Sequence, residues 1–124
     1  MSLKVICIGA GYFARFQYNA WQRIPETTIV AALNRSPEKL TPIAQDYPIP
    51  RGAALADLDT VLDEEKPDFV DIITPPETHL DLVERIAAKG IHIICQKPVA
   101  PSEAESHAVV AAAAKYGVRL MIHE

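Results

Sequence analysis

The stretch LKVICIGAGYFA, residues 3–14, predicts a buried strand that turns directly into a helix. Its first half, Leu3–Ile8, is a nearly continuous apolar run rich in β-branched residues, which is typical of a strand covered on both faces of a parallel sheet. Gly9-Ala10-Gly11 interrupts this run, and we expect a helix from residue 12 to about residue 23, just before Pro25. The stretch therefore predicts the first unit of an α/β fold.

The glycine turn also matches the pattern G-x-G-x-x-G/A, with Gly9, Gly11 and Ala14 at its three fixed positions. The first glycine permits the tight turn, the second lets a pyrophosphate approach the backbone, and the small third residue lets the helix pack closely on the strand. Backbone N–H groups and the helix dipole then favour an anion at the helix start. We expect this turn, including Tyr12 and Phe13, to bind a dinucleotide. The alternative is a structural turn without a ligand.

Strands continue to alternate with helices along the rest of the chain. Further strands are predicted at residues 28–33, 53–55, 69–73, 91–95 and 118–122, and helices at residues 36–47, 57–65, 77–89 and 102–116. Ser36, Asp57 and Ser102 are the predicted N-caps, and Glu105 completes a capping box with Ser102. This order predicts an α/β fold with a single domain, a doubly wound parallel sheet (Rossmann fold) of about six strands.

Composition narrows the classes of function. The 124 residues suffice for one core, and 12 Lys and Arg against 16 Asp and Glu give a formal charge of −4, which argues against nucleic-acid binding. No apolar run reaches the ~18 residues of a membrane span, and the chain does not start like a signal peptide. Cys7 and Cys95 are expected to be buried free thiols of a cytoplasmic protein, and no metal site is expected.

The end of the second predicted strand bears on the choice of dinucleotide. About 20 residues beyond the glycine turn, an acidic side chain would normally bind the ribose 2′-hydroxyl of NAD. Asn34-Arg35-Ser36 stands there instead, so the repulsion of a 2′-phosphate is absent and Arg35 is free to bind it or to stack on adenine. These residues favour NADP slightly over NAD. The alternative is that Ser36 is only a helix cap and Arg35 a solvated side chain.

Two further segments follow strands at the edge where an open parallel sheet binds its ligands. Thr74-Pro75-Pro76 follows the fourth strand and is expected to form a stiff wall beside the ribose and nicotinamide, unless the prolines only start the next helix. His79 lies in the first turn of that helix, where its ring either points into the cleft or has a structural role.

Gln96-Lys97-Pro98 follows the fifth strand. Lysine is costly to bury, so a lysine fixed by a following proline at this edge invites a functional interpretation. Lys97 is expected to donate a hydrogen bond or a proton to a substrate oxygen in a hydride transfer, although spacing alone favours an exposed loop lysine. His123 ends the last predicted strand at the cleft rim and is a weaker candidate.

Taken together, these motifs resemble the N-terminal domain of the Gfo/Idh/MocA oxidoreductases, the glucose–fructose oxidoreductase and inositol dehydrogenase family. The resemblance rests on residues 9–14, 31–36, 71–79 and 87–98. It implies an NAD(P)-dependent dehydrogenase or reductase acting on a sugar, cyclitol or related polyol. In that family the lysine of a Glu-Lys-Pro motif contacts the substrate and supports catalysis, and its Lys–Pro bond is often cis. This role maps onto Lys97 and Pro98, with Gln96 in place of the glutamate.

The family also carries a second α/β domain that supplies most substrate contacts, the catalytic Asp and His, and usually the dimer interface. We therefore expect residues 1–124 to be the dinucleotide-binding domain alone, from a protein that binds a small-molecule substrate and is a homo-oligomer at full length. Two alternatives stay open. One is a non-catalytic NAD(P)-binding sensor or regulatory module, which Gln96 mildly favours. The other is a Rossmann domain for another nucleotide such as FAD.

Overall fold

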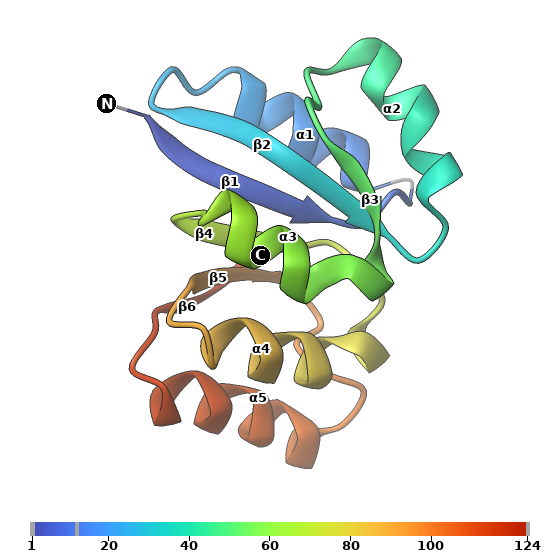
Figure 1. Ribbon diagram of the computed structural model, residues 1–124. Coiled ribbons are helices and arrows are strands. Elements are labelled where there is room, and N and C mark those ends of the chain that lie inside the picture. Colours follow the sequence, from blue (N-terminus) through green and yellow to red (C-terminus); the bar gives the residue numbers. More distant parts are fainter. Residues whose placement is uncertain (1, 12, 124) are drawn as a thin grey trace.

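The computed structural model describes residues 2–11 and 13–123, and within them six strands form one parallel sheet in the order β3-β2-β1-β4-β5-β6 (Figure 1). The strands are β1 (Leu3–Ile8), β2 (Thr27–Asn34), β3 (Gly52–Ala54), β4 (Phe69–Ile72), β5 (His92–Gln96) and β6 (Leu120–His123). All five neighbouring pairs are parallel. The predicted doubly wound sheet is confirmed.

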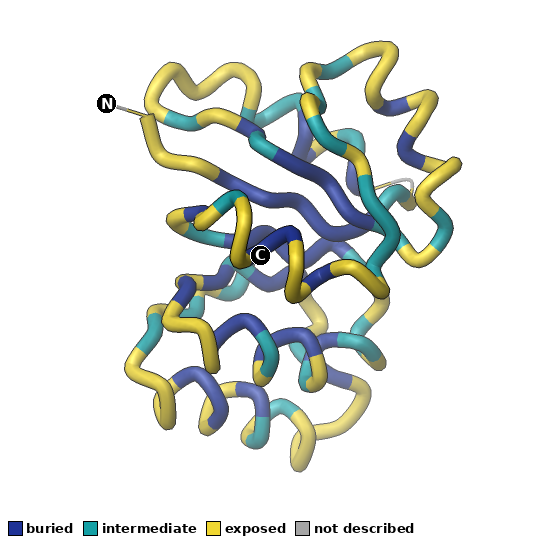
Figure 2. The backbone as a smooth tube through the Cα atoms, viewed as in Figure 1, coloured by how far each residue is buried: buried dark blue, intermediate teal, exposed yellow. Residues whose placement is uncertain are grey.

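Helices connect these strands on both faces of the sheet. They are α1 (Ala14–Gln22), α2 (Thr41–Asp46), α3 (Leu58–Glu65), α4 (His79–Ala87) and α5 (Glu103–Lys115), with 3-10 turns η1 (Pro37–Leu40), η2 (Leu55–Asp57) and η3 (Pro76–Thr78). α1 and α2 pack on one face over a cluster that includes Val5, Cys7 and Tyr18. α3, α4 and α5 cover the other face over a larger cluster, and Figure 2 shows that burial is concentrated in the strands between these layers.

Several predicted boundaries and caps were wrong. The segments predicted as helices from residues 36 and 77 begin with the 3-10 turns η1 and η3, because a proline at the first position is also compatible with the tighter turn. Ser36 makes no side-chain cap, and its carbonyl instead accepts from the Lys39 N–H at 3.1 Å. Asp57, which ends η2, also makes no side-chain cap. Ser102 does cap its helix, accepting from the Glu105 N–H at 3.2 Å.

Two more boundaries moved for local reasons. α1 starts at Ala14 rather than at residue 12, with Phe13 at the N-cap position. β6 starts at Leu120 rather than at residue 118, because the Val118 N–H still bonds to the Ala113 carbonyl at the end of α5. Neither shift changes the order of elements.

The arrangement places a crevice at the centre of the sheet. β1 and β4 are neighbours in the sheet, but the connection after β1 runs to β2 on one side and the connection after β4 runs to β5 on the other. Parallel sheets bind ligands at such a switch point. The Gly9 N–H bonds to the Leu33 carbonyl and the Ile73 N–H bonds to the Ile8 carbonyl, both at 2.8 Å, which brings these three strand ends together.

Cys7 and Cys95 are both free and buried. Burial raises the pKa of the Cys95 thiol to about 12 and raises that of the Cys7 thiol well above its usual value, so both stay protonated at neutral pH. Among the helices of the described part, none is long and apolar enough to cross a membrane. The same residues contain no group of three or more His, Cys, Asp or Glu side chains that could hold a metal ion.

Candidate functional site

The two glycines of the first turn have different structural roles. Gly9 has a φ of +132°, and a Cβ there would lie 2.7 Å from the Ile73 carbonyl oxygen, so the backbones of two strand ends approach too closely for a side chain. Around Gly11, a Cβ would meet no atom of the described residues within 4 Å. Gly9 therefore allows the turn to form, whereas Gly11 leaves open space beside it.

That open space belongs to a cleft with a volume of about 560 Å³. Its size is in the usual range for small-molecule sites. The lining residues come from the glycine turn and from the carboxyl ends of β2, β4, β5 and β6: Gly9, Ala10, Gly11, Phe13, Asn34, Ile73, Thr74, Pro75, Gln96, Lys97 and His123. The structure thus brings the predicted motifs together at one edge of the sheet (Figure 1).

The glycine turn offers hydrogen-bond donors to this cleft. The Ala14 N–H bonds to the Gly11 carbonyl at 3.0 Å, but within residues 2–11 and 13–123 no acceptor faces the N–H groups of Ala10, Gly11 and Phe13. The Tyr18 hydroxyl donates to the Gly9 carbonyl at 3.0 Å and fixes the turn from below. Free N–H groups at the start of a nine-residue helix fit the pyrophosphate of a dinucleotide. Tyr12, also predicted to contact the cofactor, lies outside the described residues.

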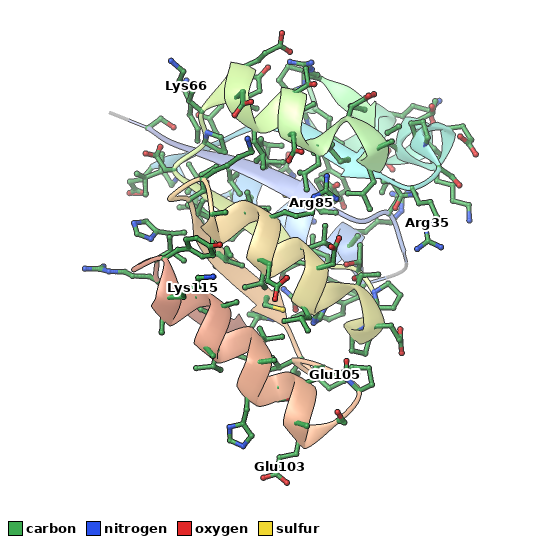
Figure 3. All side chains as sticks on the ribbon, turned by 60° about the horizontal axis from the view of Figure 1, so that its bottom comes forward. Arg35, Lys66, Arg85, Glu103, Glu105 and Lys115 are labelled. Carbon is green, nitrogen blue, oxygen red and sulfur yellow. The ribbon has the colours of Figure 1, made fainter. Side chains whose placement is uncertain are left out.

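A second hollow of about 440 Å³ continues from the cleft past Asn34 and is lined by Arg35, Ser36 and Lys39. Asn34 holds this corner by donating from Nδ2 to the Ser36 carbonyl at 3.0 Å. Figure 3 shows the Arg35 side chain extending away from the body of the protein. Glu77 supplies the one carboxylate among the described lining residues of this hollow, so two cations face one anion there.

The loop after β4 separates the two hollows. Thr74 and Pro75 line both of them, as expected of a wall. The Thr74 and Thr78 hydroxyls lie 2.6 Å apart, and Thr78 also donates to the Pro75 carbonyl at 2.7 Å. Pro76 starts η3 and lines neither hollow. Thr74 and Pro75 therefore form the predicted wall, whereas Pro76 starts the next helical segment.

His79 lies beneath this loop and not in the cleft. Its ring is 1% exposed, with Nε2 2.8 Å from the Thr74 carbonyl and Nδ1 2.8 Å from the Val99 carbonyl. The Cys95 sulfur lies 3.1 Å from the same Nδ1. This geometry gives no support to the predicted cofactor contact; the ring joins the loops that follow β4 and β5.

The segment after β5 reaches the cleft through two of its three predicted residues. Lys97 lines the cleft, and no ion pair of its ammonium occurs within the described residues. The Lys97–Pro98 peptide bond is cis, as the resemblance implied, and Pro98 lies outside the cleft lining. Gln96 lines the cleft while its side chain is largely buried.

Gln96 connects the cleft to a buried carboxylate, Asp71, which has no exposed surface. The carboxylate accepts from Trp21 Nε1 and Gln17 Nε2, each at 2.7 Å, and from Gln96 Nε2 at 3.2 Å. Gln96 Oε1 in turn lies 2.8 Å from Nδ1 of His123. Burial raises the pKa of Asp71, and the three hydrogen bonds and the nearby His123 oppose that rise.

The sequence did not predict the hydrogen-bonded line from Asp71 through Gln96 to His123, and His123 was only a weaker candidate for the site. A lone carboxylate inside the apolar run of residues 69–73 was a signal for Asp71, because a buried charge needs partners. The pairing of Gln96 with His123 depends on the register between β5 and β6, which the sequence pattern does not contain. Lys39, in the second hollow, was missed because η1 brings it back toward the end of β2.

Comparison with known proteins identifies relatives of the whole chain. A family model described as "Oxidoreductase family, NAD-binding Rossmann fold" matches residues 3–124. The chain is 41% identical to a D-apiose dehydrogenase of Paraburkholderia graminis and 35% identical to one of Rhizobium rhizogenes, in each case over 98% of this chain and 32% or 35% of the relative. An inositol 2-dehydrogenase of Rhizobium meliloti is 30% identical over 80% of this chain and 29% of its own length.

Solved structures agree with the fold. An oxidoreductase from Agrobacterium radiobacter, crystallised with NAD⁺, L-tartaric acid and magnesium, superposes with a TM-score of 0.91 at 35% identity. The match covers all of this chain and 36% of that one. An aldose-aldose oxidoreductase from Caulobacter crescentus gives a TM-score of 0.85 at 32% identity, over 98% and 37% of the two chains. The chain spans about a third of the length of the relatives it matches.

Proposed function

Because the chain belongs to the Gfo/Idh/MocA oxidoreductase family, whose NAD-binding Rossmann fold spans residues 3–124, we propose that it is the dinucleotide-binding part of an NAD(P)-dependent dehydrogenase or reductase for a sugar or polyol. The observation that carries this proposal is the cleft at the switch point, where Gly11 and free N–H groups lie at one end and Lys97 at the other. The names of the relatives, two D-apiose dehydrogenases and an inositol 2-dehydrogenase, support the class of substrate.

Each part of the cleft has a proposed task. The glycine turn holds the pyrophosphate, the second hollow holds the adenosine ribose, and the Thr74-Pro75 wall and the end of β5 hold the nicotinamide end. The predicted residues that line the cleft or the second hollow are the cofactor-binding residues of this proposal: Gly9, Gly11, Phe13, Asn34, Arg35, Ser36, Thr74, Pro75, Gln96 and Lys97. Tyr12, Ala14, Pro76 and Pro98 belong to it only as their neighbours in the sequence.

Lys97 is the proposed catalytic residue. The nicotinamide, when bound, supplies the chemistry of hydride exchange with a carbon of the substrate. The Lys97 ammonium, at the cleft, is placed to donate a hydrogen bond or a proton to the oxygen on that carbon during reduction, and its neutral amine to take the hydroxyl proton during oxidation. A cation unpaired within the described residues is suited to this task because no carboxylate there competes for its hydrogens.

The whole protein is proposed to be cytoplasmic and homo-oligomeric, with residues 1–124 as its dinucleotide-binding domain and a second domain that completes the substrate site. The support is the greater length of the relatives, of which this chain matches about a third. The chain by itself is then expected to bind the dinucleotide and to turn over little or no substrate.

Saturable binding of NADH or NADPH to the 124-residue chain is the direct test. Nicotinamide fluorescence is followed during titration, and ADP-ribose is expected to displace the cofactor because it carries the same pyrophosphate. Nicotinamide mononucleotide, which lacks the pyrophosphate, serves as the matched control and is expected not to compete at the same concentration. Absence of saturable binding by both nicotinamide cofactors, or tighter binding of FAD than of either, would contradict the proposed function.

A preference for NADP is the finer part of the proposal, and it rests on Arg35 and Lys39 beside Asn34. Arg35→Ala is expected to weaken NADPH binding by about tenfold or more, because a charge-assisted hydrogen bond to phosphate contributes about 1.5–3 kcal/mol, and to leave NADH binding nearly unchanged. Arg23→Ala, at the opposite end of α1 from the glycine turn, is the control. Equal loss of both cofactors in Arg35→Ala would argue against a 2′-phosphate at this hollow.

A further inference from the structure

His123 meets the cleft on one side and a buried polar line on the other. Gln96 and His123 are direct partners in the β5–β6 register, so their side chains leave the sheet on the same face. Asp71 is the partner of Ile94, two residues before Gln96, and therefore belongs to that face as well. The three side chains form a continuous line from the interior of the sheet to the cleft, joined at 3.2 Å and 2.8 Å.

The inner end of this line accepts hydrogen bonds only. Trp21 Nε1 is a donor without acceptor capacity, and both it and Gln17 Nε2 point at Oδ2 of Asp71. The remaining oxygen, Oδ1, faces Gln96. A carboxylate surrounded by three N–H donors is satisfied in its ionised form, and it requires the amide nitrogen of Gln96, rather than the amide oxygen, to face it.

This requirement fixes the hydrogen on His123. With the Gln96 nitrogen turned to Asp71, Gln96 Oε1 faces Nδ1 of His123 at 2.8 Å and can only accept, so Nδ1 carries the hydrogen. A neutral imidazole has one N–H, and Nε2 is then left with a lone pair. No hydrogen bond of Nε2 to another described residue is present, and none of the described side-chain nitrogens or oxygens is both buried and unpaired. Nε2 therefore keeps exposed surface, on a residue that lines the cleft.

We infer that Asp71, acting through Gln96, holds His123 as the Nδ1–H tautomer and presents Nε2 to the cleft as an acceptor for an N–H or O–H group of the bound ligand. Lys97, a donor, lines the same cleft, so this end of it offers one donor and one acceptor to a polar group. A carboxamide of the cofactor and a hydroxyl of a polyol both carry such a hydrogen. The identity of the ligand rests on the proposed function, whereas the tautomer does not.

Nitrogen-15 NMR of the histidine-labelled chain, without ligand, tests the tautomer. Wild type is expected to show a protonated Nδ1 and an unprotonated Nε2 for His123, with the resonances assigned from their loss in His123→Gln. Asp71→Asn is expected to reverse this pattern. Its oxygen still accepts from Trp21 and Gln17, while its new amide N–H turns Gln96 around and makes Nδ1 the acceptor.

Gln96→Leu supplies a second variant in which the line is simply interrupted, and the Nδ1–H form is expected to lose its dominance. The midpoint of thermal unfolding is measured for each variant to show that it folds. An Nε2–H tautomer in wild type, or the wild-type tautomer in folded Asp71→Asn, would overturn the inference. Because no cofactor is present, this outcome is independent of whether the proposed function holds.

Addition of ligands tests the acceptor role. A shift of the Nε2 resonance on addition of NADH supports a contact from the cofactor, and a shift only on further addition of D-apiose supports a contact from a substrate hydroxyl. Because a second domain is proposed to complete the substrate site, the NADH addition is the decisive one: no change at Nε2 in a chain that binds NADH would overturn a contact from the cofactor to His123. A chain that does not bind NADH would contradict the proposed function instead.

Discussion

Replacing Gly9 by alanine is expected to lower the free energy of unfolding by about 2–5 kcal/mol. Two costs add at this position. The φ of +132° is rarely adopted by a residue with a side chain, and the new Cβ would lie 2.7 Å from the Ile73 carbonyl oxygen. Since that oxygen belongs to the backbone, relief requires β1 and the end of β4 to move apart. Urea denaturation followed by the fluorescence of Trp21, the single tryptophan, measures the loss.

Gly11→Ala is the matched control for the same turn. Around its new methyl group no atom of the described residues lies within 4 Å, so the free energy of unfolding is expected to change by less than about 1 kcal/mol. The methyl group does project into the space proposed for the pyrophosphate, and NADH affinity is expected to fall at least about tenfold. A Gly9→Ala chain as stable as wild type would show that the turn tolerates a side chain.

Asp71→Leu is expected to be similarly damaging, with a loss of about 3–5 kcal/mol. Leucine has the same branching but larger methyl groups, and it removes the acceptor of Trp21 Nε1 and Gln17 Nε2, which come from a partly buried and a buried side chain. Asp71→Asn keeps one oxygen for both donors and is expected to lose far less. The comparison separates the role of the acceptor from that of the charge, and equal losses in the two variants would contradict the role given to the acceptor.

The charge of Asp71 makes the stability of the protein depend on pH, and the direction follows from its pKa. The pKa of Asp71 is raised above its ordinary value of 3.8, chiefly by burial. The folded state therefore binds this proton more tightly than the unfolded state, so the contribution to stability is fully present below the unfolded pKa and is lost as pH rises through the folded pKa. The stability of wild type relative to Asp71→Asn is expected to fall with rising pH across that interval. Urea unfolding of both proteins from about pH 3.5 to pH 7 measures the gap, and a gap that widens in favour of wild type would contradict the direction.

The fold followed from the sequence because its signals are local. Continuous apolar runs such as Leu3–Ile8 mark strands buried on both faces, and glycines and prolines mark where those strands end. The ends of helices were less predictable, because a proline such as Pro37 or Pro76 is equally acceptable in a 3-10 turn.

Only part of the candidate site could be predicted from the sequence, because the contacts of its side chains are not determined locally. Motifs at strand ends predicted which segments meet, and Gly11, Thr74 and Lys97 do line one cleft. The neighbours of each side chain depend on register and burial. His79 was therefore expected near the cofactor and lies beneath the loop, while the link from Asp71 to His123 became evident only with the strands paired.

The central position of β1 also governs how the chain reaches its folded state. β1 is made before the other strands of this sheet, yet one of its two edges pairs with β4, so Val5 cannot pair with Phe69 until β4 has been made. Such long-range pairings make folding slow compared with that of helical bundles of the same length. During synthesis this apolar strand edge stays open until residues 69–72 have been made, and in this interval aggregation competes with folding.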